Sequence, residues 1–174
     1  LLARFTRVEL LLQAVHTAPF ATLALAHGRT MGAGADLFAA CSERWIVDDA
    51  QFAFPGASFG LVLGTARLAN LVGAPQAAEW VEGGRSFDAD AACSSGLATR
   101  RIEASRVEVE RQALRARVSR LDAATQRDIR AAISAGRHPR GPAGDSDDLA
   151  RLVQSAARPG LRQRMTAYRD AQRR

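Results

Sequence analysis

The sequence predicts an α/β core followed by a region of helices alone. As far as residue 103, short apolar runs bounded by Gly or Pro alternate with amphipathic stretches. This is the pattern of strands alternating with helices. After residue 104 the stretches are longer, charged and amphipathic, with no strand pattern between them. We therefore divide the chain into a core over 1–103 and a helical region over 104–174.

Local signals place the elements of the core. Residues 1–17 carry apolar side chains at helical spacing and stop before Pro19. The apolar run 20–26 is short and bounded by Pro and Gly, as a buried strand is. In order, we expect a helix (1–17), a strand (20–26), a Gly-rich turn (28–34), a helix (35–42), two short strands (44–48 and 51–54), a loop (55–64), two helices (65–71 and 75–82), a helical turn (88–95) and a strand (97–102).

The helical region is expected to contain three helical stretches, at 105–121, 123–135 and 147–174. Pro159 and Gly160 should break the last of them. The segment 137–148 is polar and rich in Pro and Gly, which predicts a mobile loop. Asp145 or Ser146 is placed to cap the helix that follows.

Composition excludes several classes of function. The chain has 174 residues and a formal charge of +6, and all its basic residues are Arg. Without Lys it has neither a Schiff-base lysine nor a Walker-type phosphate lysine. The Arg residues are spread among acids on predicted helices. We therefore favour solvated helix faces over a nucleic-acid surface, which stays as a weaker alternative.

Cysteine and histidine usage predicts a reduced cytoplasmic protein without a metal site. Cys41 and Cys93 have no metal-like spacing, and His16, His27 and His138 do not cluster. No apolar run approaches the roughly 18 residues needed to span a bilayer. The N-terminal stretch has the character of a transit peptide or of a core-facing amphipathic helix, and we favour the helix.

The segment GRTMGAGADL (28–37) has the clearest chemical meaning. Gly32 and Gly34 allow a tight turn and a close approach to a ligand. The helix that follows directs its free N–H groups, and the positive end of its dipole, at the turn. Such a turn binds a phosphate or an oxyanion. It is not a dinucleotide fingerprint, because Leu37 stands where the third Gly would be.

The longer run PFATLALAHGRTMGAGADLFAACSERWIVDDAQFAFPGASFGLVLG (19–64) resembles the crotonase (enoyl-CoA hydratase/isomerase) superfamily. The N/H-G turn, the G-x-G-x-E/D-L helix start and the strand that leads to Pro follow in the family's order. The segment 64–73 and the stretch 85–103 continue the resemblance. It implies that 1–103 is the later part of a ββα spiral core. It also implies that 104–174 is a helical trimerisation or lid region.

The resemblance carries two catalytic roles onto this sequence. In the family, the middle residue of G-x-G gives a backbone N–H to the oxyanion hole, and that residue is Ala33 here. Ala keeps the backbone group, so the role survives the change from Gly. The first hydratase carboxylate falls on Asp36, which is one methylene shorter than Glu. Capping of the helix as a first-turn acid remains an equal alternative for Asp36.

The second hydratase carboxylate falls on Gly56, which has no side chain. Hydration uses two carboxylates to position and activate a water, so we do not expect standard hydratase activity. We interpret Asp48, Asp49 and Glu82 as surface residues. The predicted substrate contacts are Gly32, Gly34, Gly56 and Phe59.

Other residues near the motif have a structural interpretation. We expect a hydrogen bond at the turn for His27 and a structural ion pair for Arg67. Trp80 is expected to lie in the core rather than in an acyl pocket.

The resemblance implies an enzyme of fatty-acyl metabolism that acts on an acyl-CoA thioester by stabilising an enolate. Coenzyme A would enter as part of the substrate, with no other cofactor. The family's assembly implies a homotrimer or hexamer. Nothing in 1–17 resembles the family's A-x-x-A-G-x-D segment, so we expect the first half of the fold to lie upstream of Leu1. The alternative is a non-catalytic CoA-binding or scaffold subunit.

Overall fold

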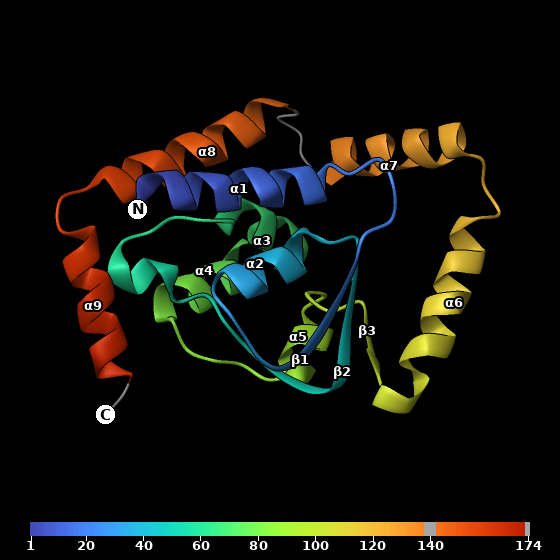
Figure 1. Cartoon of the computed structure of the whole chain (residues 1–174), viewed down its shortest axis with the longest axis horizontal. Coiled ribbons are helices and arrows are strands. Elements are labelled where there is room, and N and C mark those ends of the chain that lie inside the picture. Colours follow the sequence, from blue (N-terminus) through green and yellow to red (C-terminus); the bar gives the residue numbers. More distant parts are fainter. Residues whose placement is uncertain (138–141, 173–174) are drawn as a thin grey trace.

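A three-stranded parallel sheet lies at the centre of the computed structural model, which describes residues 1–137 and 142–172. The strands follow the order β1 (Leu23–Met31), β2 (Glu43–Ala53) and β3 (Arg100–Ile102). β1 and β2 pair along nearly their whole length, whereas β3 pairs with β2 over three residues. The mixed α/β fold with a helical majority confirms the predicted fold class (Figure 1).

Helices surround the sheet and then continue beyond it. Those of the core are α1 (Leu2–His16), α2 (Ala33–Ala40), α3 (Thr65–Val72), α4 (Ala74–Gly83) and α5 (Ala89–Ser94). Those of the C-terminal region are α6 (Val107–Val118), α7 (Ala123–Arg137), α8 (Pro142–Ala157) and α9 (Leu161–Ala171). Two short 3₁₀ helices are η1 (Pro55–Phe59) and η2 (Ala104–Arg106). α8 packs along α1 and α9 packs on η1, so the last helices return to the core (Figure 1).

Small side chains and a few aromatic rings fill the core between α2, the sheet and α3 to α5. Ala26, Ala35 and Ala39 are almost fully buried, which lets α2 lie close to β1. Trp80 is buried and stacks on Phe87 with ring centroids 3.6 Å apart. The expectation that Trp80 belongs to the core is thus confirmed.

The first two strands are longer than the sequence indicated. β1 extends through His27 and Gly28 to Met31, so His27 is an exposed strand residue and not part of a turn. A register shift lies between Ala26 and Gly28. The predicted pair of strands at 44–48 and 51–54 is one strand, β2, which continues through Asp48 at φ 55°. Pairing between β1 and β2 on both sides of the irregularity outweighs the local turn signals.

In the C-terminal region, α8 begins earlier than predicted. Residues 142–148 are helical rather than a loop, because Pro142 is favourable at the first helical position. Asp145 and Ser146 therefore lie inside α8 rather than before its first residue. The predicted mobility of the remaining loop falls on 138–141, outside the described residues. The break at Pro159–Gly160 is confirmed, with Gly160 at φ +81°.

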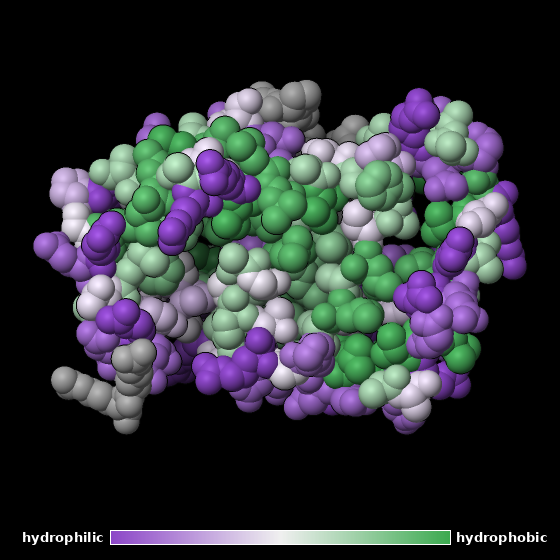
Figure 2. Space-filling model, viewed as in Figure 1, coloured by the Kyte–Doolittle hydropathy of each residue, from purple (hydrophilic) through white to green (hydrophobic). Residues whose placement is uncertain are grey.

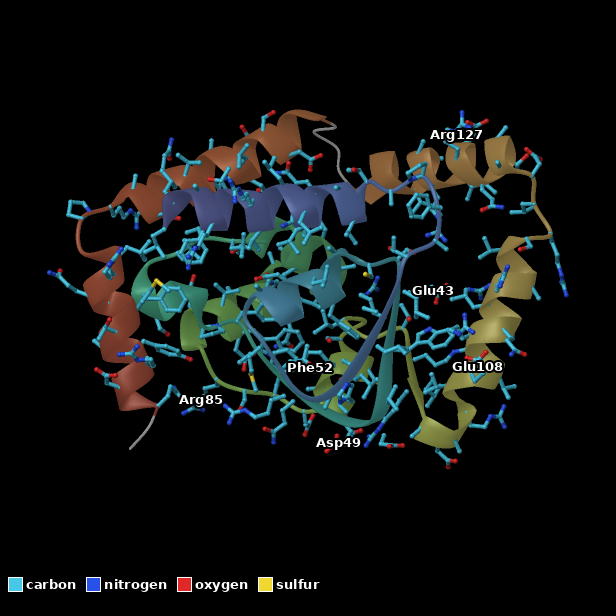
Figure 3. The ribbon with its side chains drawn as sticks, in the orientation of Figure 1. Glu43, Asp49, Phe52, Arg85, Glu108 and Arg127 are labelled. Atoms are coloured by element: carbon cyan, nitrogen blue, oxygen red, sulfur yellow. The ribbon has the colours of Figure 1, made fainter. Side chains whose placement is uncertain are left out.

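α6 and α7 stand at the right-hand edge of Figure 1, away from the helices that cover the sheet. The Arg117 guanidinium on α6 pairs with the carboxylate of Glu43 at the start of β2. Figure 3 labels Glu43 on the side of the sheet that faces α6. Apolar side chains on these helices remain exposed, among them Val109 and Ile133. Within 1–137 and 142–172, no helix has both the length and the apolar character needed to cross a membrane.

Candidate functional site

The turn from β1 into α2 is built on Gly32. Its φ of +55° lies in the left-handed region, which strains any residue with a β-carbon. Its N–H donates to the Ala53 carbonyl oxygen at 2.9 Å, which ties the turn to the end of β2. α2 begins at Ala33, so the N–H groups of its first turn have no carbonyl of the same helix to bond. These N–H groups make the turn electropositive.

A cavity of about 70 Å³ lies against the start of α2. Its wall combines the N-terminal turn of α2 with η1 and apolar side chains. The lining residues are Phe5, Gly32, Ala33, Asp36, Phe54, Gly56, Ala57, Phe59, Leu61, Leu63, Thr65 and Val81. The structure therefore brings together every predicted site residue except Gly34.

Gly34 faces a second, larger groove of about 530 Å³ on the other side of α2. Phe20 and Leu37 line this groove and are exposed, as is Leu25 on β1. β1 has one hydrogen-bonded neighbour, β2, among the described strands. Figure 2 shows apolar surface gathered around α1 and the strands, and α1 contributes the exposed Leu10 and Leu11.

Asp36 is the carboxyl group inside the small cavity, and it is only 6% exposed. Burial raises its pKa from 3.8 to about 8; the positive charge of Arg67 opposes the rise and the negative charge of Glu9 adds to it. The carboxyl is therefore mostly protonated at neutral pH. Asp36 lies in the first turn of α2, as the alternative of a helix-capping acid also requires, so its position alone does not separate the two interpretations.

A buried ion pair lies behind Asp36. Arg67 on α3 donates from Nη1 and Nη2 to the two carboxylate oxygens of Glu9 on α1, at 2.8 and 2.7 Å. The side chains are 1% and 0% exposed. Gln13 Nε2 also donates to Glu9 Oε1 at 2.9 Å. The structural ion pair expected for Arg67 is confirmed.

Glu9 was not singled out in the sequence, although a signal was present. It follows Phe5 by four residues and precedes Leu12 by three, so it lies on the buried face of the first helix. An acid at such a position must find a cation or a hydrogen-bond donor, because an unpaired buried charge is costly. Arg67 was the available cation.

The wall opposite α2 contains Gly56 and Phe59. A β-carbon at Gly56 would lie 3.2 Å from the Leu61 carbonyl oxygen, so the position is tight as well as uncharged. The Phe59 ring packs edge-on against Tyr168 of α9, with centroids 5.6 Å apart. Arg164 Nε donates to the Phe59 carbonyl oxygen at 2.8 Å and fixes α9 to this wall.

The other nearby acids lie outside the cavity. Asp48, Asp49 and Glu82 are exposed, as predicted. Figure 3 shows Asp49 at the lower rim of the sheet, away from α2. No cluster of three or more His, Cys, Asp or Glu side chains suited to a metal occurs in the part of the chain that the structure describes. Asp36 is accordingly the acid placed to meet a ligand at the start of α2.

Comparison with known proteins agrees with this geometry. The profile of the family "Enoyl-CoA hydratase/isomerase" matches residues 4–168, nearly the whole chain. The chain belongs to the enoyl-CoA hydratase/isomerase family. This confirms the resemblance to the crotonase superfamily.

A solved structure of this family shows the same fold. It is described as an enoyl-CoA hydratase/isomerase of Bordetella parapertussis and superposes with a TM-score of 0.86 at 41% sequence identity. The match covers 96% of this chain and 67% of that one. A second, from Pseudoalteromonas atlantica, is 21% identical with a TM-score of 0.78 and covers 92% of this chain and 66% of that one. That second likeness concerns the fold alone.

Two curated relatives match half of the chain. The ethylmalonyl-CoA decarboxylase of Danio rerio is 34% identical over 90 residues, which are 50% of this chain and 30% of the relative. A Bacillus subtilis protein described as an enoyl-CoA hydratase is 30% identical over 94 residues, 52% of this chain and 36% of the relative. The chain thus spans about a third of the length of these two members of the family.

Proposed function

We propose that this protein acts on an acyl-CoA thioester by stabilising an enolate in the cavity at the start of α2. The thioester carbonyl oxygen would accept a hydrogen bond from the Ala33 N–H. Asp36 would exchange a proton with the carbon next to the thioester. The observation that carries the proposal is the cavity itself. Ala33, the first residue of α2, and Asp36, three residues later, both line it, which supports these two roles.

The position of Ala33 suits a developing negative charge. Its N–H belongs to the first turn of α2, where the helix dipole and the unsatisfied donors favour an anion. Most of the side chains around the cavity are apolar, and surroundings of low polarity strengthen such an interaction. Removal of one such donor typically lowers kcat by roughly 10²–10³-fold.

The state of Asp36 favours proton donation. A carboxyl with a pKa of about 8 is uncharged at neutral pH and holds the proton that an enolate carbon needs. Gly56 supplies no second carboxylate, so the pair that activates water in a hydration is incomplete. The arrangement therefore supports reactions that need one proton transfer at the α-carbon rather than addition of water.

A decarboxylation has this requirement. Loss of CO₂ from a carboxyl-substituted acyl-CoA leaves the electron pair of the broken C–C bond as an enolate, and one proton completes the reaction. The Danio rerio relative bears the name of such an enzyme. We place decarboxylation first among the reactions to be tested, with double-bond isomerisation second.

Coenzyme A would be part of the substrate in this proposal, and no other cofactor is required. The exposed apolar side chains of α6 and α7 support a further proposal, that these helices contact other copies in a homotrimer or hexamer. We place the protein in the cytoplasm on its two free cysteines, Cys41 and Cys93.

The decisive experiment compares turnover of three thioesters by the purified protein: crotonyl-CoA, a 3-enoyl-CoA and ethylmalonyl-CoA. We expect negligible hydration of crotonyl-CoA and measurable conversion of at least one of the others. Asp36→Ala should abolish the conversion while leaving CoA-thioester binding. Asp49→Asn, which alters an exposed acid, is the matched control. Equal turnover by Asp36→Ala would remove Asp36 from the mechanism.

A non-catalytic CoA-binding subunit is the second candidate, and Gly56 is the observation in its favour. It predicts tight binding of CoA thioesters with no turnover across the panel. Turnover by the isolated protein would reject it.

A further inference from the structure

The charges around Asp36 are arranged unusually for a buried acid with a cation close by. Arg67 lies close to Asp36, and both side chains approach the same point beside Gly64. A β-carbon built on Gly64 would be 2.5 Å from Asp36 Oδ1 and 3.7 Å from Arg67 Nη2. Yet both Arg67 Nη atoms bond Glu9 instead. Among the described residues, the guanidinium makes its only salt bridge with Glu9.

Building on the function proposed above, we propose that Glu9 engages Arg67 so that Asp36 stays uncharged and is ready to donate its proton. Glu9 and Arg67 are positioning residues in this arrangement, since neither lines the cavity. A bidentate pair of opposite charges presents little net charge to its neighbour. Desolvation then decides the state of Asp36.

The remaining charges near the cluster are consistent with this balance. Glu9 faces Asp36 from α1 and Arg67 faces it from α3. Asp148 on α8 faces the same ion pair and also accepts a hydrogen bond from Arg151 at 2.8 Å. Gln13 holds Glu9 from the next turn of α1 and bonds the Asp145 carbonyl oxygen as well. The orientation of Glu9 is therefore fixed from two sides.

Removing the Glu9 charge should release Arg67 toward Asp36. In Glu9→Gln the guanidinium is uncompensated, and an unpaired buried cation favours the ionised form of the nearest carboxyl. The pKa of Asp36 should then fall. In Arg67→Met the opposite holds, because the negative charge of Glu9 faces Asp36 without its partner. The double variant removes both charges and should restore the balance.

The test is a pH titration of the Asp36 carboxyl by ¹³C NMR, with the signal assigned by its loss in Asp36→Asn. Glu9→Gln should lower the midpoint by about one unit or more, roughly a tenfold change in the protonation equilibrium. Glu9→Gln/Arg67→Met should return to within about half a unit of the wild type. The matched control Glu43→Gln removes a carboxylate paired with Arg117 outside the cavity, and should leave the midpoint unchanged.

An unchanged or raised midpoint in Glu9→Gln would overturn the proposal. If that variant does not fold, the double variant decides, and a midpoint displaced by more than about one unit contradicts the balance of charges. A purely structural ion pair predicts loss of stability without these displacements. The titration needs no substrate, so its result is separate from the test of turnover. The alkaline limb of the pH–rate profile should move with the midpoint wherever turnover is measurable.

Discussion

The Asp36 carboxyl occupies the space that a side chain at Gly64 would need. A β-carbon at Gly64 would lie 2.5 Å from Asp36 Oδ1, closer than real contacts of this kind. Gly64 also has φ +65°, which only Gly adopts without strain. The start of α3 thus reaches the acid that α2 presents, and the two helices are fitted to each other at this point.

Gly64→Ala is predicted to destabilise the protein in two ways, through backbone strain and through collision with Asp36. Strain alone costs about 1–2 kcal/mol. The matched control is Gly28→Ala, at φ +59° with no atom within 4 Å of the new β-carbon. Chemical denaturation should show a distinctly larger loss for Gly64→Ala. Equal losses at the two positions would mean that Asp36 does not fill this space.

Removing one member of the Glu9–Arg67 pair is predicted to destabilise the protein strongly, whereas replacing both members should destabilise it little. Either single variant, Glu9→Gln or Arg67→Met, leaves one buried charge and should cost about 3–5 kcal/mol of unfolding free energy. The double variant should lose much less than the sum of the two. A double-mutant cycle by urea denaturation measures this coupling. Additive losses would show that the pair does not act as a unit.

Asp36→Asn is predicted to alter how stability depends on pH. The pKa of Asp36 is raised in the folded protein from 3.8 to about 8, so its contribution is fully present below pH 4 and is lost as the pH rises toward 8. Asn cannot ionise and lacks this loss. The free energy of unfolding of the variant should therefore rise relative to that of the wild type between about pH 4 and 8, by on the order of a few kcal/mol. Parallel stability curves over this range would contradict the raised pKa.

Ala33→Pro is predicted to remove the oxyanion donor with little effect on the fold. Ala33 is the first residue of α2, where Pro is tolerated because its missing N–H has no partner in the helix. We expect thioester binding to persist and kcat to fall roughly 10²–10³-fold. Ala33→Ser keeps the N–H and is the control. A kcat unchanged by Pro would place the thioester oxygen elsewhere.

The sequence predicted the order of elements and five of the twelve residues that line the cavity, because these depend on local signals. The Gly-rich turn before α2 and the Gly64 start of α3 are such signals. It missed the fusion of 44–48 and 51–54 into β2, since pairing with β1 is a long-range interaction. It also grouped Gly34 with the other substrate contacts, whereas Gly34 lines the groove on the other side of α2, because position around a helix decides which cavity a residue lines.

The Glu9–Arg67 pair shows a different limit. Each residue carries a local hint of burial, but 58 residues separate them. Their meeting depends on how α1 and α3 pack across α2. The charge state of Asp36 follows from that meeting, so the sequence motif identified the acid and left its protonation undetermined.

The central claim is that the Ala33 N–H stabilises an enolate and that Asp36 protonates it. The most direct measurement is the exchange of the α-hydrogens of butyryl-CoA for deuterium in D₂O, followed by NMR. A group that protonates an enolate also removes the proton in reverse. We predict exchange by the wild type that rises toward about pH 8 as Asp36 ionises. The exchange should be lost in Asp36→Asn and unchanged in Asp49→Asn. Equal exchange by the wild type and Asp36→Asn, or none by a wild type that binds the thioester, would contradict the account.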